Sequence, residues 1–137
     1  MSPVSDTHRD IRLNLRLTVE PSEIGGIRHI VIQQLAEWEC TAIVDDVVLV
    51  VGELLANVHA HAEGVCGLTV ERRGERLVVR VSDTVMTPPA LRAGSGSTET
   101  GRGLVLIDAL TEHWETTITS TGKVITCTFT TPTPPPT

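Results

Sequence analysis

A helical pattern between residues 42 and 62 is the strongest structural signal in the sequence. Apolar side chains recur there at intervals of three and four residues, which places them on one broad face of a helix. Asp45 and Asp46 stand near the start of the pattern, where negative charge suits the positive end of the helix dipole. The segment therefore predicts a long helix with one apolar side. The apolar positions are Val44, Val47, Val48, Val51, Leu54, Leu55 and Val58.

Strand patterns lie on both sides of this helix. Residues 11–19 alternate between apolar and polar side chains, which is typical of a half-buried strand. Two hairpins are predicted further along the chain, because pairs of strand-like runs are separated there by short turns that contain glycine. Their strands are residues 67–73 and 76–83, joined at Gly74 and Glu75, and residues 116–121 and 123–130, joined at Thr121 and Gly122.

Two further helices are predicted. Pro21 and Ser22 end the first strand, and Ser22 is a candidate N-cap for a helix that continues to Trp38. A shorter helical pattern covers residues 103–110. The segment before it, residues 88–100, is rich in proline, glycine, serine and threonine, and it predicts a flexible loop.

The order of these elements indicates the fold class. Strands and helices that mix without strict alternation favour an α+β fold, a two-layer sandwich in which a mixed sheet carries helices on one face. The 137 residues fit one domain, which we expect to span residues 11–130. Residues 1–10 are expected to form a flexible N-terminus, and residues 131–137 a disordered proline-rich tail.

The composition argues against several functions. The net charge is −6 and only 2% of the residues are aromatic, so direct binding of nucleic acid is not expected. No apolar run has the length of a membrane span, and the N-terminus lacks the apolar core of a signal peptide, so we expect a cytoplasmic protein. Cys40, Cys66 and Cys127 are widely spaced and are predicted to be reduced, buried thiols.

The first candidate site lies on the long helix. Glu53, Asn57 and His61 are four residues apart, so they share one face. A carboxylate and an amide on one stripe offer oxygen ligands to Mg²⁺, and Glu53 is also a candidate base that accepts a proton from a hydroxyl or a water. The alternative is a solvated polar stripe on an amphipathic helix.

Two other segments add polar groups of the same kind. Asp83 ends an apolar strand, where its carboxylate is able to accept a hydrogen bond from an exocyclic amine; a turn or capping aspartate is the alternative. Gly101, Arg102, Gly103 and Leu104 open the last predicted helix, whose N-terminal N–H groups favour phosphate. Each signal is modest alone, but together they describe one nucleotide pocket.

These motifs resemble those of the bacterial anti-sigma-factor serine kinases, in the gyrase/chaperone/histidine-kinase ATPase superfamily. The run Gly-Glu-Leu-Leu-Ala-Asn-Val-His-Ala-His-Ala at residues 52–62 is similar to the N box of that family. Val81-Ser82-Asp83 with Pro88-Pro89 beyond it resembles the first glycine box, and residues 98–107 resemble the second. Trp114 and Gly122-Lys123 are similar to residues of the actinobacterial branch. The resemblance covers roughly residues 13–129.

The resemblance implies a Bergerat (histidine-kinase-like ATPase) fold and a set of roles. Asn57 would coordinate Mg²⁺ at the ATP phosphates, Glu53 would be the catalytic base, and Asp83 would bind the adenine amino group. Gly101, Arg102, Gly103 and Leu104 would lie at the phosphates, with residues 90–100 as the ATP lid. Such a protein would sequester a sigma factor and phosphorylate an antagonist (anti-anti-sigma) protein on serine, and a homodimer is plausible by resemblance.

Two alternative functions remain open at this stage. Val85 and Thr87 stand where the family and the wider superfamily have small residues, and Val124 stands where a threonine near the adenine is common. A partner-binding regulatory module without ATP binding is therefore the second hypothesis. A metal protein that uses His59, His61 and Cys66 is the third, although a His-x-His pair on a helix points its rings about 200° apart.

Overall fold

The computed structural model describes residues 11–61, 65–84 and 98–131, which form an antiparallel sheet and a layer of helices. The predicted N-terminal segment, most of the predicted loop and residues 132–137 of the predicted tail lie outside the described residues. None of the described helices is long and apolar enough to cross a membrane. The elements are β1 (Ile11–Thr18), α2 (Pro21–Glu37), the 3₁₀ turn η1 (Thr41–Ile43), α3 (Val44–His61), β2 (Val65–Arg73), β3 (Arg76–Asp83), α4 (Thr98–Leu110), β4 (His113–Ile118) and β5 (Lys123–Thr130).

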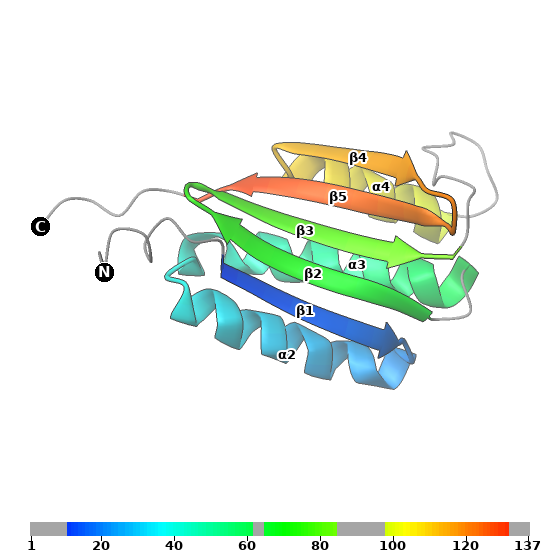
Figure 1. The fold of residues 1–137 in the computed structure, drawn as a ribbon, viewed down its shortest axis with the longest axis horizontal. Coiled ribbons are helices and arrows are strands. Elements are labelled where there is room, and N and C mark those ends of the chain that lie inside the picture. The colour runs from blue at the N-terminus through cyan, green and yellow to red at the C-terminus, as the bar shows by residue number, and fades with distance from the viewer. Residues whose placement is uncertain (1–10, 62–64, 85–97, 132–137) are drawn as a thin grey trace, which may run out of the picture.

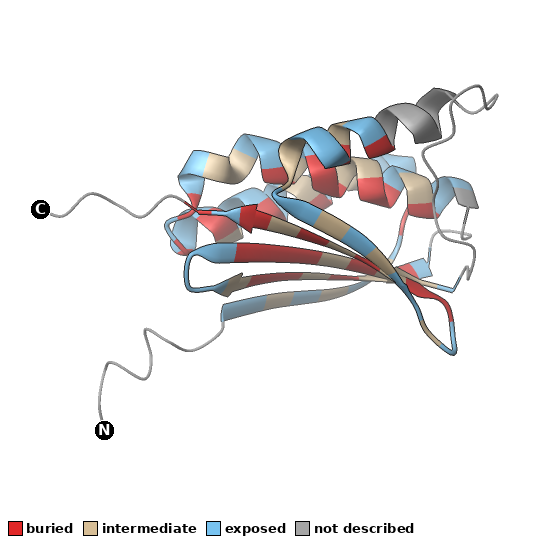
Figure 2. Cartoon of the chain, turned by 90° about the horizontal axis from the view of Figure 1, so that it is seen from above, coloured by how far each residue is buried: buried red, intermediate tan, exposed pale blue. Residues whose placement is uncertain are grey.

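The sheet has the strand order β1-β2-β3-β5-β4, and the helices cover one of its faces (Figures 1 and 2). The predicted α+β sandwich with helices on one face is therefore confirmed. Every neighbouring pair of strands is antiparallel, whereas a mixed sheet was expected. The reason is the position of β5. After β3 the chain passes through α4, and β4 then has the same orientation as β3. β5 lies between these two strands and runs antiparallel to both.

The core lies between the sheet and the helices, and the alternating patterns of the sequence fill it. In β3, Leu77, Val79 and Val81 are buried, and in β5 the buried residues Ile125, Cys127 and Phe129 point to the same side. The apolar side of α3 supplies the middle of this layer, and α2 and α4 add buried residues on either side. All three cysteines are free and buried, as predicted.

Three local predictions are corrected by the structure. Ser22 is not the N-cap of α2: the helix begins at Pro21, whose fixed φ and missing N–H suit the first helical position, and Glu20 precedes it without a side-chain cap. α4 begins at Thr98 rather than at residue 103, so the last three residues of the predicted loop are helical. Thr131 belongs to the folded part, because it is buried and its backbone N–H donates to the carbonyl of Glu75.

The uncovered face of the sheet carries a buried carboxylate that the sequence pattern did not reveal. Glu71 in β2 is only 1% exposed, because arginines from three strands surround it. Its carboxylate contacts Arg12 at 2.8 Å, Arg80 at 3.1 Å and Arg73 at 3.6 Å. The hydrogen bond from Arg12, more than the other arginines, lowers the pKa of Glu71 against the opposing effect of burial.

Replacing Glu71 by glutamine is expected to lower the free energy of unfolding at neutral pH by about 1–2 kcal/mol, since the arginine partners still reach solvent. The lowered pKa means that the stabilisation is present above the unfolded-state pKa of about 4.3 and disappears as the pH falls through the folded-state value. Urea unfolding of both proteins at pH 7 and at pH 3.5 tests this. A difference that stays equal at both pH values would contradict the assignment.

Candidate functional site

The candidate site residues gather at one end of the molecule. Figure 1 shows the C-terminal end of α3, the end of β3, the β4–β5 turn and the start of α4 at the same end of the fold. Four segments that are apart in the sequence thus meet because the helices lie along the strands and α4 begins near the point where β3 ends. The residues of the predicted nucleotide pocket come from these segments.

Glu53 and Asn57 lie one turn apart on α3, and both are partly exposed at the edge of the buried side of this helix, which includes Leu54 and Val58. The Nδ2 atom of Asn57 is buried and has no hydrogen-bond partner among the described residues. A buried donor without a partner costs about 1–3 kcal/mol, so a protein rarely keeps one unless something binds to it. An amide in this position is able to donate to a phosphate oxygen through Nδ2 and to ligate a cation through Oδ1. The side chains present therefore fit Mg²⁺ and phosphate at this point.

Asp83 forms a buried ion pair that sequence reasoning missed. The ammonium of Lys123, the first residue of β5, lies 3.0 Å from Oδ1 and 2.9 Å from Oδ2 of Asp83. The two side chains are 7% and 3% exposed, so the pair is almost closed off from solvent. The pair follows from the strand register, because Asp83 and Lys123 face each other across β3 and β5. Asp83 is thus an acceptor that already has a cation beside it.

Val124, which was expected near an adenine, lies on the other face of the sheet. Side chains alternate along β5, so Val124 points away from Lys123 and Ile125, and its partner across β3 is Ser82. Lys123, and not Val124, is therefore the residue of β5 that lies beside Asp83. Val85 and Thr87 lie outside the described residues.

The turn before β5 holds this pair in place through a close approach of two backbones. A Cβ atom added to Gly122 would lie 1.8 Å from the carbonyl oxygen of Asp83 and 2.7 Å from the Cα of Thr84. Only a glycine allows the β4–β5 turn to come so near the end of β3. The hydrogen bond from the N–H of Thr119 to the carbonyl of Gly122, at 2.8 Å, closes the turn.

The start of α4 is the third part of the site. Gly101, Arg102 and Gly103 lie within the first turns of the helix rather than before it, and their side chains are outside the described part. Leu104 is fully buried in the core, so its side chain packs there. The N–H groups that a helix leaves without an internal partner belong to its first turn, and α4 begins at Thr98, so Gly103 and Leu104 lie beyond that turn.

The metal hypothesis finds no support in the described residues, where no group of three or more His, Cys, Asp or Glu side chains is arranged to hold a metal. Nδ1 of His59 lies 3.2 Å from the carbonyl of Val19, which ties α3 to the segment before α2. Burial, and to a lesser degree the Asp83 carboxylate, raises the pKa of Cys66 to about 11, so this thiol stays protonated at neutral pH. The side chain of His61 is outside the described part.

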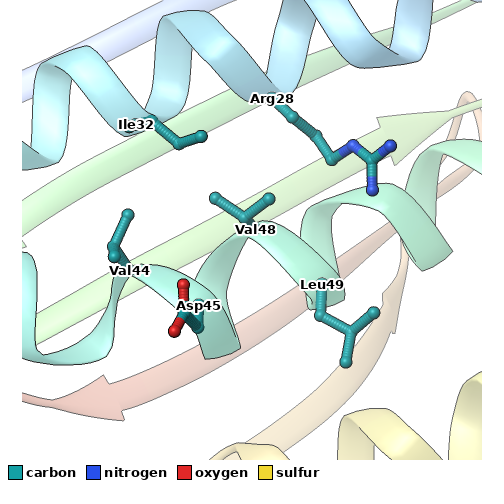
Figure 3. Close-up of a pocket in the computed structure, with 6 residues that line it drawn as sticks. All are labelled: Arg28, Ile32, Val44, Asp45, Val48 and Leu49. Atoms are coloured by element: carbon teal, nitrogen blue, oxygen red, sulfur yellow. The ribbon is translucent and has the colours of Figure 1, made fainter.

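A separate groove lies between α2 and α3 (Figure 3). It is lined by Ile32, Val44, Val48 and Leu49, with Arg28 and Asp45 as its charged members. Leu49 lies one turn before Glu53 on α3, and Glu53 is not among the residues that line the groove.

Comparison with known proteins agrees with this geometry. Residues 17–129 match the histidine kinase-like ATPase domain family. The chain resembles a crystal structure of the RsbU and RsbW domains of Rv1364c from Mycobacterium tuberculosis, with a TM-score of 0.67, 18% identity and coverage of 88% of this chain and 32% of that one. It also resembles a chain of the SiaB–SiaC complex from Pseudomonas aeruginosa, with a TM-score of 0.60, 17% identity and 92% coverage of both chains. No curated protein sequence matches it.

The chain therefore belongs to the histidine kinase-like ATPase domain family, because the family match extends over most of its length. At 17–18% identity the two structures show a shared fold and nothing finer. The chain spans about a third of the Mycobacterium tuberculosis chain that it resembles.

Proposed function

We propose that this protein is an ATP-binding regulator of the anti-sigma-factor kinase type, which transfers the γ-phosphate of ATP to a serine of an antagonist protein. The observation that carries the proposal is the buried Nδ2 atom of Asn57, which has no hydrogen-bond partner within the described part of the chain and lies on α3 one helical turn from Glu53. An unsatisfied donor beside a partly exposed carboxylate is the arrangement expected of a site for a phosphate and a cation.

Each residue has a distinct role in this proposal. Asn57 holds the phosphates and their Mg²⁺, and Asp83 accepts a hydrogen bond from the base. The N–H groups in the first turn of α4, which begins at Thr98, favour negative charge. Glu53 accepts the proton of the serine hydroxyl, which makes the oxygen a better nucleophile. Mg²⁺, when bound, neutralises charge that builds up on the phosphate oxygens, and the protein contributes mainly by positioning these groups.

The partners in this proposal are proteins. The SiaB–SiaC structure is a complex of two proteins, and the Mycobacterium tuberculosis structure contains an RsbU and an RsbW domain. By analogy, this chain would bind an anti-anti-sigma antagonist, a sigma factor or both, and it would do so as a homodimer.

Calorimetric titration with Mg²⁺-ATP tests the proposal. We expect saturable binding to the wild type and a loss of at least tenfold in affinity for Asn57→Ala, since hydrogen bonds to charged groups contribute about 1.5–3 kcal/mol. Asn14→Ala is the matched control, because Asn14 is an exposed residue of β1 on the uncovered face of the sheet. Equal ATP affinity of all three proteins would refute the role of Asn57.

The second candidate function is a partner-binding module without nucleotide. The ion pair between Asp83 and Lys123 favours it, because the acceptor expected to bind adenine already has a buried partner. This function predicts no binding of Mg²⁺-ATP or Mg²⁺-ADP up to millimolar concentration, together with partner binding that is the same in the wild type and in Asn57→Ala.

A further inference from the structure

The buried pair of Asp83 and Lys123 changes what the end of β3 offers to a base. A carboxylate alone accepts hydrogen bonds and donates none, whereas an ammonium donates three. Nζ of Lys123 lies within 3.0 Å of both oxygens of Asp83, so the two groups stand side by side at the end of β3. A base that bound at this point would meet a donor and an acceptor together.

The Asp83–Lys123 pair would distinguish purines by the substituent at carbon 6 of the ring. Adenine has an amino group there, which donates, and hypoxanthine and guanine have a keto oxygen, which accepts. A buried carboxylate without a cation bonds to the amino group and repels the keto oxygen, so it strongly favours adenine. A carboxylate paired with an ammonium has a partner for either substituent.

We propose that Lys123 makes this nucleotide site tolerant of 6-keto purines, so that inosine and guanosine triphosphates bind with affinities close to that of ATP. The inference rests on the proposed function, because it assumes that Asp83 faces the base. Lys123 would act as a specificity-determining residue. A keto oxygen would accept a hydrogen bond from Nζ, and an amino group would donate to Asp83.

The local structure permits this exchange of partners. Nζ of Lys123 donates a hydrogen bond to Oδ1 of Asp83 at 3.0 Å and lies 2.9 Å from Oδ2, so an N–H that turned to a keto oxygen would leave the ammonium beside the carboxylate as its counter-charge. Lys123 is held at the first position of β5 by its register with Asp83, and the turn at Gly122 fixes the distance between the two strands. The donor is thus held beside the acceptor by the sheet itself.

The test compares Mg²⁺-ATP with Mg²⁺-ITP, which differ only at the 6-position and in the proton at N1. Dissociation constants for the full-length wild type are measured by calorimetry. We expect the two values to lie within about tenfold of each other, which is less than one hydrogen bond to a charged group contributes. A preference for ATP of more than tenfold would overturn the inference and leave the proposed function intact. If neither nucleotide binds, the proposed function fails and the inference falls with it.

Lys123→Met then isolates the ammonium. It removes the donor but keeps the length of the side chain, so the ratio of ITP to ATP dissociation constants is expected to rise by about ten- to hundredfold. Arg16→Met removes one positive charge from an exposed position on β1 and is expected to leave the ratio unchanged. An unchanged ratio in Lys123→Met would overturn the inference. If this variant does not fold because Asp83 loses its partner, the wild-type comparison still decides.

Discussion

Gly122→Ala is expected to lower the free energy of unfolding by about 3 kcal/mol or more. The added Cβ would lie 1.8 Å from the carbonyl oxygen of Asp83, which is far inside the contact distance of two atoms. The obstructing atoms are backbone, so no side chain can rotate away. The β4–β5 turn and the end of β3 would have to separate, which would also disturb the pair of Asp83 and Lys123.

Gly25→Ala is the matched control for this substitution. It introduces the same methyl group in the exposed N-terminal half of α2, where no atom lies within 4 Å of the new Cβ. Alanine is the better helix former, so this variant is expected to be more stable than the wild type by about 0.5–1 kcal/mol. Urea unfolding of the two variants and the wild type measures both effects. A Gly122→Ala protein with wild-type stability would show that the two backbones do not approach as described.

Glu53→Gln is expected to reduce phosphate transfer by about 10²–10⁴-fold while ATP affinity stays within about twofold of the wild-type value. Glutamine has nearly the same shape as glutamate but no longer accepts a proton, so the loss falls on the chemical step. Phosphate release from ATP, with water in place of the serine hydroxyl as the acceptor and with protein in excess, reports whether Glu53 acts as a base without requiring a partner protein. The nucleotide affinity comes from the same titration that tests Asn57.

Glu115→Gln serves as the control, because Glu115 is exposed on β4, in the edge strand of the sheet. Its rate of phosphate release and its ATP affinity should equal those of the wild type. A Glu53→Gln protein that releases phosphate at the wild-type rate would exclude Glu53 as the base. Loss of ATP binding in Glu53→Gln would instead assign Glu53 to the binding site.

Most of the fold was predictable because each element carries its own periodic pattern. In β1, β3, β5 and α3 one face packs against the core, and the spacing of apolar residues in the sequence identifies that face. The bounds of β3 and β5 were predicted correctly, since turn residues flank them. β4 was displaced by three residues, because its short, mostly threonine-rich pattern has few apolar positions to fix its start.

The residues of the candidate site could be predicted from the sequence, but only part of their geometry could. The spacing of Glu53 and Asn57 places them on one stripe of any helix, so their proximity needs no tertiary information. The stripe alone gave no sign that Nδ2 of Asn57 would be buried without a partner, because burial depends on what packs above the helix.

By itself, the sequence determined the elements, the buried face of each one and the order in which they follow, because these depend on interactions between residues that are near in the chain. Only the tertiary structure decided that the strands pair antiparallel throughout, that Glu71 is buried among three arginines and that Lys123, not Val124, stands beside Asp83. These features depend on strand order and register. A shift of one residue in the register would move every side chain of β5 to the other face, and no pattern within β5 records which strand it will pair with.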